Sequence, residues 1–184
     1  MRLCLVILLS VGWGVWALGD QGGGPKVVYI IRHAEKPDSK DDPNLSPRGY
    51  KRADALVKVF PARFCVPDFI WATAPSNHSL RPLETVTPLA QSLHLTALDE
   101  FSDDDYAKLA HELLSDGRFA GKSVLVCWHH EKIPDLASAL GAKDAPDHWK
   151  DDVFDRVWEL RFENGKVVDF ENRPEEALPG DSQK

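Results

Sequence analysis

Residues 27–35, VVYIIRHAE, begin as an apolar, β-branched run and end abruptly in charged residues. Such a run is typical of a parallel strand that is buried on both faces. Open α/β sheets bind their ligands at the carboxyl ends of these strands. We therefore expect Arg32 and His33, which end the strand, to lie in a binding or catalytic site.

Strand-like and helix-like segments alternate along the rest of the chain. The predicted strands span residues 26–31, 69–74, 123–128, 156–162 and 166–170. The predicted helices begin near residues 46, 80, 103 and 134, and Pro61 is expected to end the first. Asn164-Gly165 joins the last two strands as a hairpin turn. This order predicts an α/β three-layer sandwich with a mostly parallel central sheet, helices on both faces and a C-terminal β-hairpin.

The first residues have the pattern of a secretory signal peptide. Met1-Arg2 is a short positive start, residues 3–18 carry no charge, and Ala17-Leu18-Gly19 ends the apolar run with small residues. The alternative is an uncleaved membrane anchor, although the run is slightly short for a membrane span and contains Gly12 and Gly14. We expect a secreted or periplasmic protein that has no stable membrane association once the signal is removed.

The remainder of the chain is predicted to form one domain. Residues 1–19 are assigned to the signal peptide, 20–25 to a flexible lead-in, 26–171 to the folded domain and 172–184 to a loose tail. The formal net charge of the 184 residues is −7, and the sequence contains no basic cluster. These features argue against nucleic acid and anionic membrane surfaces as partners.

Two imidazoles and two guanidiniums are predicted to converge at one edge of the sheet. His33 follows the first buried strand, His129 follows another, and Arg81 begins the helix after the strand between them. Guanidinium groups match phosphate oxygens in geometry and charge, as Arg32 and Arg81 would do here. A neutral histidine can also attack phosphorus and carry the phosphoryl group.

Four segments in order resemble the histidine phosphatase superfamily, the phosphoglycerate-mutase-like proteins. Residues 32–35 (RHAE) resemble its Arg-His-Gly/Ala-Glu signature, and residues 45–49 (LSPRG) resemble its Leu-Thr-x-x-Gly helix start. Residues 81–85 (RPLET) are similar to its Arg-x-x-Glu/Gln-Thr, and residues 124–134 to its last strand and second histidine. Trp128 stands where the family has glycine, which predicts a narrower pocket.

The resemblance implies a phosphomonoester hydrolase that uses no metal or organic cofactor. His33 would be the phosphorylated nucleophile, Arg32 and Arg81 would bind the phosphate, and His129 would support the transferring group. Glu100 is the favoured proton donor. Four other acids remain as alternatives for that role: Asp103, Asp104, Asp105 and Glu131.

Two other functions compete with this interpretation. The uncertain proton donor and Trp128 favour a catalytically weak domain that binds phosphorylated ligands without turnover. A metal-dependent hydrolase would draw its ligands from His33, His129, His130 and Glu131. Two arginines in the same pocket would repel a cation, so the metal-free phosphatase is preferred.

Overall fold

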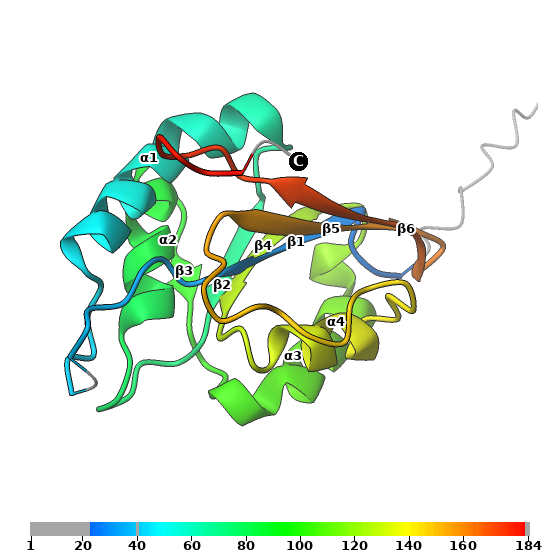
Figure 1. Ribbon diagram of the computed structural model, residues 1–184. Coiled ribbons are helices and arrows are strands. Elements are labelled where there is room, and N and C mark those ends of the chain that lie inside the picture. The colour runs from blue at the N-terminus through cyan, green and yellow to red at the C-terminus, as the bar shows by residue number, and fades with distance from the viewer. Residues whose placement is uncertain (1–22, 40, 183–184) are drawn as a thin grey trace, which may run out of the picture.

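A six-stranded sheet runs through the middle of the computed structural model, which describes residues 23–39 and 41–182 (Figure 1). Its strands are β1 (Val27–Arg32), β2 (Phe69–Ala72), β3 (Ala97–Leu98), β4 (Ser123–Trp128), β5 (Arg156–Glu163) and β6 (Lys166–Pro174). The α-helices are α1 (Pro47–Arg63), α2 (Arg81–Ser92), α3 (Tyr106–Ser115) and α4 (Ile133–Ala139). Two 3₁₀ turns, η1 (Asp103–Asp105) and η2 (Gly117–Phe119), flank α3.

The strand order, β3-β2-β4-β1-β5-β6, places the two histidine-bearing strands side by side. β1, β2, β3 and β4 are parallel, whereas β5 and β6 form the predicted antiparallel hairpin. In the β1–β4 register Arg32 lies opposite Trp128. The residues that follow, His33 and His129, therefore emerge at the same edge of the sheet.

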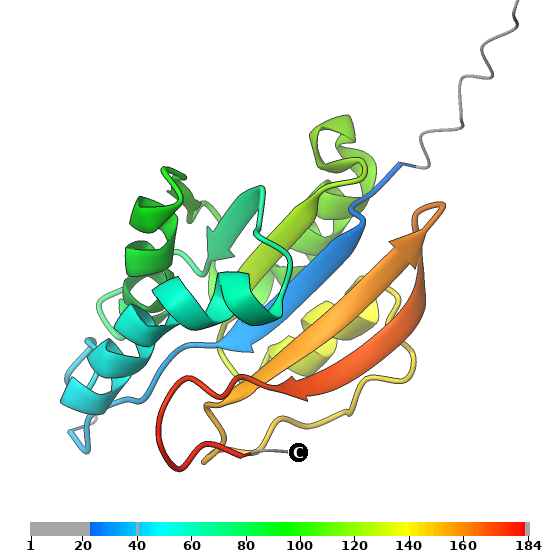
Figure 2. The same cartoon turned by 90° about the horizontal axis from the view of Figure 1, so that it is seen from above.

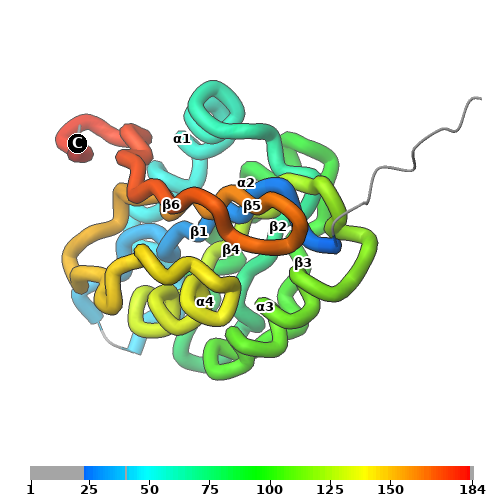
Figure 3. Tube along the Cα trace, turned by 90° about the vertical axis from the view of Figure 1, so that its right-hand side faces the viewer, coloured from blue at the N-terminus to red at the C-terminus, as the bar shows by residue number. Residues whose placement is uncertain are grey.

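Helices cover both faces of the sheet, which confirms the predicted three-layer arrangement. α1 and α2 lie on one face and α3 and α4 on the other (Figures 2 and 3). Alternate residues of each central strand pack toward opposite layers, as the pleat of a strand requires. On β1, for example, Ile30 belongs to the α3–α4 core and Ile31 to the α1–α2 core.

The prediction that Pro61 ends the first helix was wrong. α1 continues to Arg63, and the Phe64 N–H still donates to the Phe60 carbonyl at 2.9 Å. Proline costs a helix one N–H donor and crowds the preceding turn. Phe60 and Phe64 are both buried against Tyr29, and this apolar packing outweighs the local cost.

The structure also differs from the prediction of a loose tail over residues 172–184. β6 extends to Pro174, and the Glu175 N–H donates to the Asp155 carbonyl at 2.8 Å. Glu175 and Asp181 are buried, because Arg52 on α1 draws both carboxylates inward. The predicted signal peptide, residues 1–19, lies outside the described residues. None of the helices in the described segments is long and apolar enough to span a membrane.

Candidate active site

The four residues predicted to share one site are brought together by the fold. The ring centroids of His33 and His129 are 5.2 Å apart. The positive charges of Arg32 and Arg81 act on both imidazoles. The sequence prediction therefore grouped these four side chains as the structure does.

A short hydrogen-bond chain fixes the segment that carries His33. The Ala34 N–H donates to Thr85 Oγ1 at 2.9 Å, and the Thr85 hydroxyl donates to the Arg81 carbonyl at 2.7 Å. The same threonine thus ties the residue after His33 to the first turn of α2. This contact explains the spacing of the Arg81-to-Thr85 motif, since an (i, i+4) pair shares one helix face.

The start of α1 packs equally closely against the segment after His33. The Ser46 N–H donates to the Glu35 carbonyl at 2.9 Å, and the Ser46 hydroxyl caps α1 by accepting from the Gly49 N–H at 3.1 Å. A Cβ at Gly49 would lie 2.4 Å from the Glu35 carbonyl oxygen. Glycine is therefore required where the helix meets the backbone of the site.

Several buried donors at this edge have no partner within the described protein. Arg81 donates from Nη1 to the Asp42 carbonyl and from Nη2 to the His78 carbonyl, yet its Nε–H is unpartnered. The Nε–H and the Nη2 group of Arg32 are unpartnered as well. Buried donors without partners are rare in native proteins. Guanidinium donors left in this state suit an anionic ligand.

Burial keeps both imidazoles neutral. Loss of hydration is the main cause that lowers the pKa of His33 well below its ordinary value. Loss of hydration and the neighbouring arginines together lower the pKa of His129 to about 4. His33 Nδ1 lies 2.7 Å from the Ala34 carbonyl oxygen, which can only accept. Nδ1 therefore carries the proton and Nε2 keeps its lone pair.

A titration tests this electrostatic arrangement. We expect the ring Cε1–H resonances of His33 and His129 to show neutral imidazoles at about pH 6.5, where an ordinary imidazole is half protonated, since burial lowers the pKa of each ring. The measurement is NMR, with each resonance assigned by single substitution. A midpoint near 6.5 for His33 would contradict the burial argument.

The predicted acids are scattered around the site. Glu100 is exposed, Asp104 pairs with Lys132, and Asp105 accepts from Ser102. Asp103 is half-buried, and burial raises the pKa of its carboxyl to about 6. Its Oδ1 is buried without a partner. Glu131 is exposed, and its charge acts on Arg32.

The side chains of Trp128 and His130 contact residues outside the group of His33, His129, Arg32 and Arg81. Trp128 is fully buried in the α3–α4 core and donates from Nε1 to the Asp103 carbonyl at 3.1 Å. The prediction that it narrows the pocket was therefore wrong, because the strand pleat directs it into the core. His130 Nε2 lies 3.2 Å from Asp151 Oδ1. Within the described ranges no three His, Cys, Asp or Glu side chains are grouped as metal ligands.

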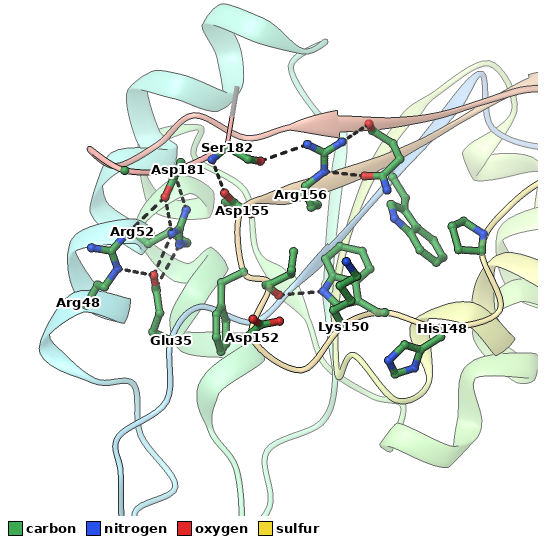
Figure 4. A pocket seen from close by; sticks show the side chains of 17 residues that line it. Glu35, Arg48, Arg52, His148, Lys150, Asp152, Asp155, Arg156, Asp181 and Ser182 are labelled. Carbon is green, nitrogen blue, oxygen red and sulfur yellow. Dashed lines mark hydrogen bonds and ion pairs between the residues drawn. The ribbon is translucent and has the colours of Figure 1, made fainter. Parts of the chain in front are cut away.

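A second group of residues, which was not part of the sequence-predicted site, lies beside it. Arg48 and Arg52 of α1 converge on Glu35 and Asp181 at one wall of a cavity of about 780 Å³ (Figure 4). Phe154, which lines the same cavity, packs against Arg32 and His33. The only sequence signal was that Arg52 falls on the buried face of α1, between Gly49 and Leu56.

Comparison with solved structures identifies the fold. No protein-family model and no curated protein matches the chain by sequence. The protein histidine phosphatase SixA complexed with tungstate matches 81% of this chain and 97% of its own, with 16% identity and a TM-score of 0.62. A mycobacterial glucosyl-3-phosphoglycerate phosphatase complexed with inorganic phosphate matches 80% and 95%, with 14% identity and a TM-score of 0.55.

A phosphoglycerate mutase from Bacillus anthracis matches 84% of this chain and 94% of its own, with 12% identity and a TM-score of 0.54. Together these structures show that the chain has the fold of the histidine phosphatase superfamily. The resemblance drawn from four short motifs is therefore confirmed at the level of the fold.

Proposed function

We propose that the protein is an exported phosphomonoester hydrolase that acts through a phosphohistidine formed on His33. The observation that carries the proposal is a pair of neutral imidazoles, the buried His33 and the partly buried His129, beside two arginines with unpartnered donors. Phosphatases with this fold, crystallised with tungstate or inorganic phosphate, support a tetrahedral oxyanion as the ligand. Export rests on residues 1–19 alone.

The first chemical step is attack by His33 Nε2 on phosphorus. A nitrogen–phosphorus bond forms, the ester phosphorus–oxygen bond breaks, and the leaving alcohol takes a proton from an acid. Arg32 and Arg81 would balance the charge on the equatorial oxygens, with His129 beside them. Water then attacks phosphorus and gives a proton to the carboxylate that protonated the alcohol, and the nitrogen–phosphorus bond breaks, which releases inorganic phosphate and restores both His33 and the acid.

Asp103 is the candidate proton donor whose pKa is best suited to the role. A general acid works best when its pKa lies near the working pH, and burial raises the pKa of the Asp103 carboxyl to about 6. Glu100 occupies the position that the family resemblance favours but is exposed to solvent. An activated aryl phosphate has a good leaving group and needs no donor, so it is the appropriate first substrate.

Trapping the intermediate tests the proposal directly. With excess EDTA present, the protein should release phosphate from an activated aryl phosphate. Rapid base quench should trap a phosphoryl group on residue 33, because a phosphoramidate survives base and hydrolyses in acid. Mass spectrometry of the peptide that contains residues 27–35 locates the modification.

Three outcomes separate the candidate functions. Phosphate release that survives EDTA, with label on His33, would support the phosphohistidine mechanism. Release that EDTA abolishes would refute it in favour of a metal-dependent hydrolase. Tight phosphate binding without turnover on any ester would favour the phosphate-binding domain, for which the exposed position of Glu100 is the motivating observation.

A further inference from the structure

One segment of the long connection between α4 and β5 wraps around Arg32. We call residues 150–154 the strap. Nη1 of Arg32 donates to three strap carbonyls: Lys150 at 3.4 Å, Asp151 at 2.6 Å and Val153 at 3.2 Å. The Phe154 ring covers the guanidinium face, with its centroid 3.9 Å from Cζ. The strap thus holds one end and one face of the Arg32 guanidinium, and Arg32 is only 2% exposed to solvent.

The strap orients Arg32 without neutralising it. Carbonyl oxygens accept hydrogen bonds but carry no net charge, whereas a bonded carboxylate would cancel the cation and compete with phosphate. The charges of Asp151 and Glu131 act on Arg32, but its Nη1 group donates its hydrogen bonds to the strap carbonyls. Its Nε–H and Nη2 group, both buried and unpartnered, remain as a two-pronged donor.

The strap is itself fixed at two points. His130 Nε2 lies 3.2 Å from Asp151 Oδ1, which links the strap to the turn after β4. The buried Trp149 donates from Nε1 to the Val153 carbonyl at 2.9 Å. The Phe154 ring also lies 6.1 Å, centroid to centroid, from the ring of His33. One aromatic side chain therefore contacts both the guanidinium and the expected nucleophile.

We infer that Phe154 is a positioning residue of the phosphate site: its ring, held by the strap, aims the free donor edge of Arg32 and supports His33. The expected effect of Phe154 on turnover rests on the proposed function. The expected effect on phosphate affinity does not, because a ring that orients Arg32 changes the affinity whether or not turnover occurs. Preorganised donors bind an anion more tightly than mobile ones, since less ordering is needed on binding.

The test compares two phenylalanines that cover arginine faces in different places. In Phe154→Leu, we expect the dissociation constant for inorganic phosphate, measured by calorimetry, to rise about five- to thirtyfold, the range of a desolvated cation–π contact. Phe64→Leu is the matched control, because the Phe64 ring lies 4.6 Å from Cζ of Arg173 outside the site. That variant should bind phosphate as the wild type does.

Two further variants separate positioning from general packing. Phe154→Tyr keeps the ring and should restore phosphate affinity to within about twofold, since tyrosine also binds cations on its face. Phe154→Met replaces the ring by apolar volume if the leucine variant fails to fold, and it should show the same weakened binding. Unchanged phosphate affinity in the leucine or methionine variant would overturn the inference, as would equal weakening in Phe64→Leu.

The inference and the proposed function fail in different ways. Wild-type protein that binds phosphate but forms no phosphohistidine would refute the proposed function, while the comparison of Phe154 with Phe64 would still decide the role of the ring. Wild-type protein that binds no phosphate would refute the inference. In active protein, Phe154→Leu should raise KM more than it lowers kcat, because Arg32 would then bind the phosphoryl group less well in the ground state.

Discussion

Replacing His33 with alanine is expected to reduce phosphate release from an aryl phosphate to the uncatalysed rate. The variant removes the imidazole that donates from Nδ1 to the Ala34 carbonyl. Because this hydrogen bond keeps the proton on Nδ1, Nε2 of His33 is free to act as the nucleophile. The two arginines and His129 would still bind phosphate, so affinity for inorganic phosphate should change far less than turnover. Steady-state phosphate release and calorimetry on the same preparation measure the two effects.

His111→Ala is the control for this variant. His111 lies on the exposed face of α3, and its loss should leave kcat unchanged. A residual rate in His33→Ala above about one thousandth of wild type would correspond to a loss below about 4 kcal/mol and would contradict covalent catalysis by this residue. Loss of phosphate binding together with activity would point instead to local collapse of the site.

The sequence could predict the sheet edge because local patterns determine it. The sequence shows the buried strands that end in Arg32-His33 and Trp128-His129 as short apolar runs. Because parallel neighbouring strands run in the same direction, their carboxyl ends lie at the same edge of the sheet. The grouping of His33, His129, Arg32 and Arg81 follows from that rule and from the helix start at Arg81. Nothing in this step needs contacts between distant, irregular segments.

The parts that escaped prediction depend on such distant contacts. The strap meets Arg32 across about 120 positions of sequence, and Arg52 meets Asp181 across 129. Both partners lie in loops that carry no periodic pattern, so no local signal marks them. The choice between the candidate acids could not be predicted for a related reason. Asp103 and Glu100 are close in sequence, and they differ in burial, which depends on the packing of distant segments.

Arg52 shows how the tail is coupled to the site. Its guanidinium donates to Glu35 from Nε and Nη2 and to both carboxylate oxygens of Asp181, at 2.8–3.1 Å, and Nη1 lies 3.5 Å from Glu175 Oε1 (Figure 4). These bonds lower the pKa of Glu35 and of Asp181. Burial raises the pKa of Glu175 to about 8, so that residue remains protonated at neutral pH. One buried cation thus holds two ionised carboxylates and the tail.

Arg52→Leu is therefore expected to reduce the free energy of unfolding at pH 7 by about 3–5 kcal/mol, the usual cost of leaving buried charges without a partner. Arg48→Leu is the matched control, because Arg48 contacts the same Glu35 and Asp181 but its side chain is 53% exposed. A solvated ion pair of this kind contributes at most about 1 kcal/mol. Urea unfolding followed by circular dichroism measures both variants.

The pH dependence identifies the cause of this loss. A carboxyl group whose folded pKa is lowered stabilises the fold above its unfolded pKa, and that contribution disappears as the pH falls through the folded pKa. The contributions of Glu35 and Asp181 are thus present at pH 7 and lost in acid. Without Arg52, the carboxyl groups of Glu35 and Asp181 lose the bonds that lower their pKa values and accept protons more readily. The difference in the free energy of unfolding between wild type and Arg52→Leu should therefore narrow steadily below about pH 4. A gap that stays constant from pH 7 to pH 3 would show that Arg52 acts through packing of its aliphatic stem rather than through its charge.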